Sequence, residues 1–131
     1  MDAHELLHAI RRGATADSLE TERLEFKQAA PALKSTLHLM ADAVVCLANA
    51  AGGHIVLGVA DRGNADEAIL GVPEELSLDV LAHGVFDRTS PPLSVAVEDV
   101  TDNGKRVARG RATSEGSRSA MATSATEPTY A

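Results

Sequence analysis

Three groups of residues have types and spacings that could support chemistry. The first is His4-Glu5-Leu6-Leu7-His8, which matches the pattern H-E-x-x-H and would place two imidazoles one helical turn apart, with Glu5 as a general base. A zinc peptidase needs such a helix inside the protein, whereas this segment starts at the fourth residue. Arg11 also stands where the extended zinc pattern has a glycine. The favoured interpretation is an ordinary amphipathic helix with solvated histidines.

The second group is Gly52-Gly53, which could suggest a phosphate-binding loop. These glycines follow a long helical pattern, and the C-terminal end of a helix carries a negative partial charge that repels phosphate. The sequence G-x-x-x-x-G-K-[ST] does not occur in the chain. A helix end that lets the backbone turn into the next strand is the favoured interpretation.

The third group consists of Glu20, Glu25 and Asp61. Glu25 is predicted on the polar face of a strand and Asp61 where a second strand leaves the sheet, so the two carboxylates converge if the strands are neighbours. Glu20 is five residues before Glu25 and joins them only if the chain bends first. Three carboxylates could hold Mg²⁺ or Mn²⁺ and activate water against a phosphodiester. Surface charges and an ordinary turn residue remain the alternative.

Length and composition restrict the class of protein. The 131 residues fit one domain, and 44% hydrophobic with 24% charged residues is typical of a soluble globular chain. The single cysteine excludes an internal disulfide and a cysteine-based zinc framework, which favours a reducing compartment. Neither a membrane-spanning run nor the basic start of a secretory signal is found. A cytoplasmic protein without membrane association is expected.

The charge balance limits any role with nucleic acid. Twelve Lys and Arg face nineteen Asp and Glu, which gives a formal net charge of -7. Such a chain repels phosphates unless basic residues cluster locally or a metal ion bridges its carboxylates to them. Lys27, Lys105 and Arg106 are predicted to form that local basic patch.

The helices that must position these residues follow from periodicity. Leu33, Leu37, Met40, Val44 and Leu47 form one apolar stripe at a period of 3.6, which predicts a helix packed on a sheet. Shorter helices are predicted over residues 4–12 and, with a serine cap, over residues 77–86.

The strands follow from alternation and turn signals. Residues 23–27 alternate as a half-buried strand, residues 54–60 form an apolar run typical of a central strand, and residues 93–100 alternate again. Asp102-Asn103-Gly104 predicts a hairpin turn. The elements together predict an α/β (α+β) fold, with a small mixed β-sheet and two or three packing helices in a single domain.

The chain divides into three predicted segments: residues 1–19 as an N-terminal helix and linker, 20–107 as the folded body, and 108–131 as a tail. The tail contains no Val, Leu, Ile or Phe, and 14 of its 24 residues are Ala, Ser or Thr. Such a segment buries little apolar surface, so it is expected to be disordered or aberrant. The early end of the strand pattern predicts a folded body that is cut short or altered near its C-terminal end.

Four sequence motifs carry a family resemblance: Leu24-Glu25-Phe26-Lys27, the run from Leu47 to Gly63 with its A-N-A-A-G-G and G-V-A-D segments, Gly71-Val72, and Pro91-Pro92-Leu93. Their order and spacing over about Glu20 to Val107 resemble the Schlafen-type AlbA-like domain. The resemblance implies an α/β fold and a DNA-binding role of the kind found in bacterial transcriptional regulators, often ahead of an ATPase-like region.

The resemblance also implies roles for particular residues. In the animal Schlafen branch the same scaffold is a metal-dependent ribonuclease that uses three acidic residues, and the matching positions here are Glu20, Glu25 and Asp61. Lys27 would be a cation that faces phosphate, and Asn49 a polar group near the helix end.

The expected function is the binding of nucleic acid, either DNA or RNA, in a regulatory role. One alternative is a divalent-metal-dependent endoribonuclease that uses the acidic triad with Mg²⁺ or Mn²⁺. The other is a protein-interaction or vestigial module that binds no ligand. A homodimer is compatible with the sequence, and the choice between DNA and RNA stays open.

Overall fold

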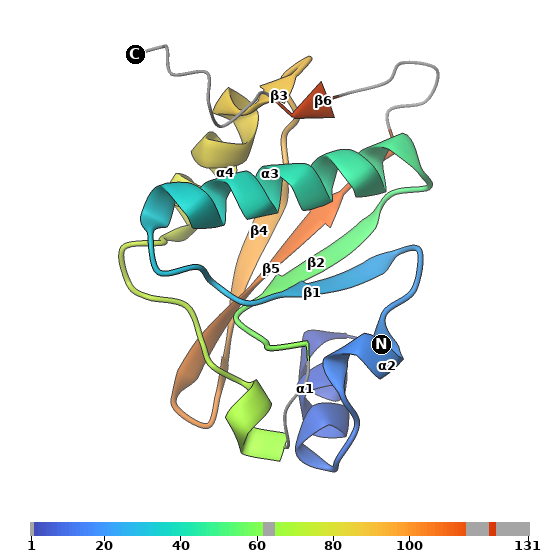
Figure 1. The fold of residues 1–131 in the computed structure, drawn as a ribbon, viewed down its shortest axis with the longest axis vertical. Coiled ribbons are helices and arrows are strands. Elements are labelled where there is room, and N and C mark those ends of the chain that lie inside the picture. The colour runs from blue at the N-terminus through green and yellow to red at the C-terminus, as the bar shows by residue number, and fades with distance from the viewer. Residues whose placement is uncertain (1, 62–64, 115–120, 123–131) are drawn as a thin grey trace.

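A four-stranded mixed sheet forms the middle layer of the structure (Figure 1). The computed structural model describes residues 2–61, 65–114 and 121–122. The first two strands of the order β1-β2-β5-β4 are parallel, and β5 is antiparallel to both of its neighbours. The strands are β1 (Leu24–Lys27), β2 (Gly53–Leu57), β4 (Ala96–Asp102) and β5 (Lys105–Ala112). The predicted α/β fold with a small mixed sheet is confirmed.

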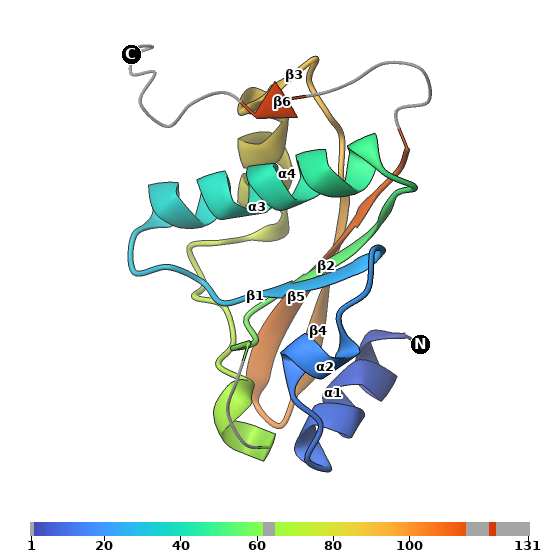
Figure 2. The same ribbon diagram turned by 45° about the vertical axis from the view of Figure 1, so that its right-hand side comes forward.

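Helices lie on both sides of this sheet (Figures 1 and 2). On one side are α3 (Leu33–Asn49) and α4 (Leu78–Asp87). The other side carries α1 (Ala3–Arg11), the short α2 (Ala16–Leu19) and the 3₁₀ turn η1 (Ala65–Ala68). A separate two-stranded ladder joins β3 (Thr89–Ser90) to β6 (Met121–Ala122). None of the described helices is long and apolar enough to cross a membrane.

The side of the sheet that faces α3 contains the core predicted from the helical stripe. Met40, Val44 and Leu47 are buried against Ile55 of β2 and Val85 of α4, and Leu37 is buried in the adjoining cluster. Leu33 is the exception, because as the first residue of α3 it keeps 44% of its surface exposed.

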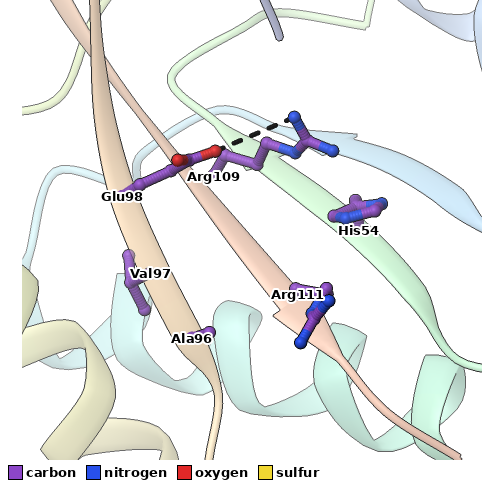
Figure 3. Close-up of a pocket in the computed structure, with 6 residues that line it drawn as sticks. All are labelled: His54, Ala96, Val97, Glu98, Arg109 and Arg111. Carbon is purple, nitrogen blue, oxygen red and sulfur yellow. Dashed lines mark ion pairs between the residues drawn. The ribbon is translucent and has the colours of Figure 1, made fainter. Parts of the chain in front are cut away.

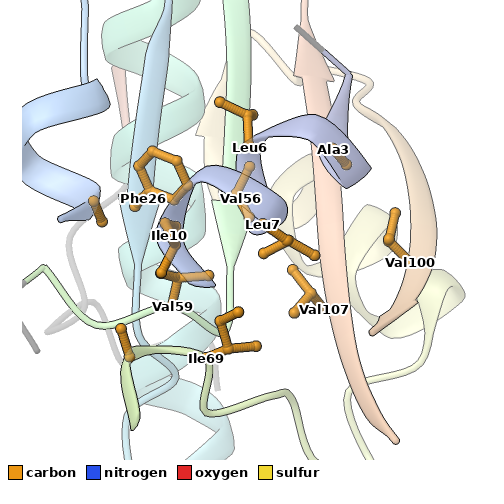
Figure 4. Packing of buried hydrophobic residues seen from close by; sticks show 12 residues of the cluster. Ala3, Leu6, Leu7, Ile10, Phe26, Val56, Val59, Ile69, Val100 and Val107 are labelled. Carbon is orange, nitrogen blue, oxygen red and sulfur yellow. The ribbon is translucent and has the colours of Figure 1, made fainter. Parts of the chain in front are cut away.

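The opposite side holds a second core beneath α1 (Figure 4). Leu7 and Ile10 of α1 pack with Phe26, Val56 and Val107 from three neighbouring strands. Val56 points toward α1 while Ile55 and Leu57 on either side of it belong to the α3 side. Burial on both faces explains why Ile55, Val56 and Leu57 of β2 are all apolar, as the sequence predicted for a central strand.

The predicted cap and hairpin turn are both present. Ser77 Oγ accepts a hydrogen bond from the Val80 amide at 3.2 Å and begins α4. Asn103 and Gly104 have positive φ angles of 54° and 83°, as the tight turn between β4 and β5 requires.

Strand β5 corrects the predicted end of the folded body at Val107. The strand continues to Ala112 and pairs with β2 from Ala108 onward. Its inward residues there are small because α3 lies close: a Cβ added to Gly110 would stand 2.8 Å from Met40 Cε. The absence of large apolar residues therefore reflects close packing at this point. The expectation of disorder for residues 115–120 and 123–131 lies outside the described residues.

The extension of β5 can be tested with Ala108→Asp in the full chain. Ala108 is 0% exposed and packs with Leu57 and Leu81, so a carboxylate there would be buried without a partner. We expect the free energy of unfolding to fall by roughly 3 to 5 kcal/mol, or folding to fail. The control is Thr113→Asp at an exposed position just beyond the strand. Urea denaturation followed by circular dichroism measures both, and equal midpoints would contradict the placement of residue 108.

Candidate nucleic-acid interface

Three basic side chains from β2 and β5 lie together on one face of the sheet (Figure 3). The register places His54 opposite Arg111 and Val56 opposite Arg109, so the period of two directs His54, Arg109 and Arg111 to the same side. With residues 96–98 of β4 they line a hollow of about 400 Å³. We call this surface the basic hollow.

The end of α3 fixes where His54 stands. Gly52 adopts a φ of 84° and its amide donates to the Leu47 carbonyl at 2.8 Å, which ends the helix. At Gly53 an added Cβ would lie 2.3 Å from the Arg23 carbonyl oxygen, and this close approach lets the His54 amide donate to that oxygen at 2.8 Å. The glycine pair is thus a turn into β2, as the sequence favoured.

Helix α1 covers the other half of the same sheet face. Arg11 Nε donates to Asp102 Oδ2 at 2.7 Å, which holds the helix near the β4–β5 hairpin. Its nine residues extend for only about 13 Å, and Leu7 packs over Val107 rather than over the later residues of β5. The residues that line the basic hollow accordingly come from strands β2, β4 and β5.

Positive charges outnumber negative charges in the basic hollow. Arg109 Nη1 lies 3.8 Å from Glu98 Oε1, a loose ion pair in which the arginine side chain is 16% exposed and the carboxylate side chain 64%. Arg111 is exposed. Two guanidinium groups against one carboxylate leave the hollow positive, although the chain as a whole carries -7. Guanidinium groups present paired donors that match phosphate oxygens.

The surroundings of His54 lower its pKa. Burial lowers the pKa of His54 below 6.5, and the charges of Arg109 and Arg111 lower it further, while Glu98 opposes them. As the pH falls, His54 is therefore protonated at a higher pH in the unfolded chain than in the folded chain. His54 consequently makes the fold less stable as the pH drops below 6.5.

The acidic triad is divided by the structure. Glu20 and Glu25 line one small hollow of about 180 Å³, because the chain bends between Thr21 and Leu24 before β1 begins. Glu20 Oε2 there accepts the Phe26 amide at 2.9 Å, and Glu25 lies 3.7 Å from Lys27 Nζ. Asp61 is exposed elsewhere, and its carbonyl accepts the Asp17 amide at 3.2 Å.

The structure does not gather the three carboxylates into one group. Glu25 is opposite Ile55 and so lies on the α3 side of the sheet, whereas the backbone of Asp61 is bound to α2 on the α1 side. Within residues 2–61, 65–114 and 121–122 no group of three His, Cys, Asp or Glu residues could hold a metal. Metal binding by Glu20, Glu25 and Asp61 remains a prediction from the sequence.

The predicted basic patch is also spread over the fold. Lys27 lies on edge strand β1, and Asn49 is the exposed last residue of α3. Lys105 and Arg106 begin β5, which β2 separates from β1. Arg106 stabilises the fold, because it donates to Asp99 Oδ1 at 2.7 Å and to the carbonyls of residues 73 and 76 at 2.7 and 2.6 Å.

The H-E-x-x-H segment is an ordinary surface helix. His4 and His8 of α1 are exposed while Leu6 and Leu7 are buried. Glu5 caps the helix, because its carboxylate accepts the Asp2 amide at 2.9 Å and its amide donates to the Asp2 carboxylate at 2.8 Å. The amphipathic interpretation is confirmed for these residues.

Sequence reasoning missed Arg109 and Arg111 because it assigned them to the tail. The missed signal is the alternation of residues 107–112, where Val107 and the two arginines share one face and Ala108, Gly110 and Ala112 share the other. Long basic residues that alternate with small ones are typical of a strand whose two faces have different surroundings.

Comparisons with known proteins agree with this architecture. The family model described as Schlafen, AlbA_2 matches residues 20–119, and the chain belongs to this family. No curated protein matched the chain.

Two solved structures share the fold. The crystal structure of the DIP2311 protein from Corynebacterium diphtheriae has a TM-score of 0.62 and 23% identity, over 86% of this chain and 22% of that one. The solution structure of the N-terminal domain of a RecG-related protein from Nitrosomonas europaea has a TM-score of 0.55 and 20% identity, over 87% of this chain and 74% of that one. The chain thus spans about a fifth of the DIP2311 structure.

The electrostatics of the basic hollow predict a measurable shift of one titration. Replacing Arg111 with Gln removes a positive charge that depresses the His54 pKa, so this pKa should rise toward 6.5, and Arg109→Gln should raise it more. Lys34→Gln, which removes an exposed charge from α3, should leave the His54 pKa unchanged. An NMR titration of the imidazole protons measures all three variants, and an unmoved His54 pKa would show that the arginines point elsewhere.

Proposed function

We propose that this chain is a nucleic-acid-binding domain and that the basic hollow is its contact surface for phosphate groups. The supporting observation is that two adjacent strands bring His54, Arg109 and Arg111 together on a chain with a net charge of -7. Elsewhere the acidic side chains repel phosphates, so binding is directed to this part of the sheet.

Membership of the Schlafen AlbA_2 family supports the same function. The fold is shared with the N-terminal domain of a protein described as related to the ATP-dependent DNA helicase RecG. A regulatory role belongs to this proposal and rests on the family, and a cytoplasmic location belongs to it because the single cysteine favours a reducing compartment. The nuclease alternative has no comparable support, since Glu20, Glu25 and Asp61 are not gathered at one site.

The proposed contact surface can be tested by removing its charges. Arg109→Gln and Arg111→Gln should each weaken binding of mixed-sequence DNA or RNA by about five- to tenfold. Each should also reduce the magnitude of the negative slope of log affinity against log salt by about one. Lys34→Gln removes one charge from α3, on the opposite side of the sheet, and is the matched control. Fluorescence anisotropy at several salt concentrations measures these quantities, and equal losses in the control and site variants would contradict the proposal.

Glu98 is expected to oppose binding. Its carboxylate lies 3.8 Å from Arg109 Nη1 and so would compete with a phosphate group for that guanidinium. Glu98→Gln removes this competition and the repulsion, so affinity should rise by about two- to fivefold. Asp42→Asn makes the same change of net charge at an exposed position of α3. If Asp42→Asn tightens binding equally in the same anisotropy assay, the effect comes from net charge and Glu98 has no local role.

A further inference from the structure

His54 is the residue of the basic hollow whose charge can change near neutral pH. Histidine is the side chain that ordinarily titrates between about pH 5 and 8, whereas arginine stays protonated and carboxylates ordinarily titrate at about pH 4. Arg109 and Arg111 against Glu98 leave one net positive charge among the lining residues, and a protonated His54 adds a second. The protonation state of His54 therefore sets how strongly the hollow attracts an anion.

The strand register brings the imidazole next to both guanidinium groups. His54 is directly opposite Arg111, and Arg109 is its diagonal neighbour two residues along β5. The Cβ atoms of directly opposite residues are about 5 Å apart, and long side chains also reach their diagonal neighbours. Figure 3 shows His54 and both arginines on one side of the sheet. A phosphate group that contacts the two arginines would therefore also meet His54.

The imidazole itself is available to a ligand. His54 is half-buried at the wall of the hollow. Within the part of the chain that the structure describes, no hydrogen bond or ion pair engages its ring nitrogens. A neutral imidazole has one N–H donor and one acceptor, and a protonated one has two donors. Protonation would thus give His54 a second donor toward phosphate oxygens and a charge that strengthens both bonds.

The charges around His54 oppose its protonation when no anion is bound. Burial and the charges of Arg109 and Arg111 lower its pKa below 6.5, the N-terminal amine acts in the same direction, and Glu98 of β4 acts in the opposite one. On β1 the residue opposite His54 is the apolar Leu24. A phosphate group would place negative charge beside the imidazole and offset the repulsion from the arginines. Phosphate binding and protonation of His54 therefore favour each other.

We propose, on the basis of the function proposed above, that His54 is the third phosphate-contacting residue of the basic hollow and takes up a proton from solvent when a phosphate group binds. Arg109 and Arg111 supply the permanent charge, and His54 supplies a charge that the ligand itself induces. Because the contact is made to phosphate, it applies to DNA and RNA alike, and affinity for either rises as the pH falls.

The pH dependence of binding tests this role. The probes are labelled mixed-sequence DNA and RNA of about twenty nucleotides, bound to the full chain at low salt. Fluorescence anisotropy should give an affinity about tenfold higher at about pH 5.5 than at about pH 8, because an opposite charge beside a titrating group changes its proton affinity by about tenfold or more and binding is linked to protonation. His54→Gln should lose most of this change. His83→Gln, at an exposed position of α4 on the other side of the sheet, should keep it.

An NMR titration of the unaltered chain gives a second measurement that does not depend on a variant. A saturating amount of either probe should raise the pKa of His54, and circular dichroism confirms that each variant is folded. A pKa that the probe leaves unmoved, or a pH dependence that His54→Gln retains, would overturn the role of His54. Binding that is equal at both pH values but weakened in Arg111→Gln would also overturn it and leave the proposed function standing. If neither probe binds at either pH, both proposals are wrong.

Discussion

The close approach of α3 to β5 determines which residues the strand carries on each of its two faces. Where the helix crosses the strand, the facing residues are small, and a Cβ added at Gly110 would stand 2.8 Å from Met40 Cε, 3.1 Å from Val95 Cγ2 and 3.3 Å from Ile55 Cγ2. Because side chains alternate along a strand, fixing Ala108, Gly110 and Ala112 on the helix side also fixes Arg109 and Arg111 on the other. The packing of one face therefore determines the chemistry of the opposite face.

The sheet face that carries Arg109 and Arg111 has an apolar end and a polar end. Near the β4–β5 hairpin it is apolar, and α1 covers it through Leu7 and Ile10, with Arg11 bound to Asp102. At the other end the residues become His54, Arg109 and Arg111, which α1 does not reach. The alternation of side chains places the apolar core and the candidate binding surface on the same side of these strands. They remain separate because the short helix α1 covers only the end near the β4–β5 hairpin.

Much of the fold could be predicted from the sequence because its signals are local. The apolar stripe of α3, the cap at Ser77 and the turn at Asn103-Gly104 each depend on residues that are close in the chain. The length of β5 could not be predicted in that way, because Ala and Gly become strand residues there only through contact with a distant helix. Because the predicted body ended before those residues, both arginines of the candidate site were assigned to the tail.

The acidic triad shows how register limits a site inferred from spacing. Neighbouring strands β1 and β2 do place Glu25 near the chain that leads to Asp61, as expected. Glu25, however, is opposite Ile55 and shares its side of the sheet, while the chain after β2 turns toward α2 and binds Asp17 through the Asp61 carbonyl. Two side chains on neighbouring strands meet only if they also share a face of the sheet. The basic residues of β2 and β5 satisfy both conditions, and for that reason the candidate function is built on them.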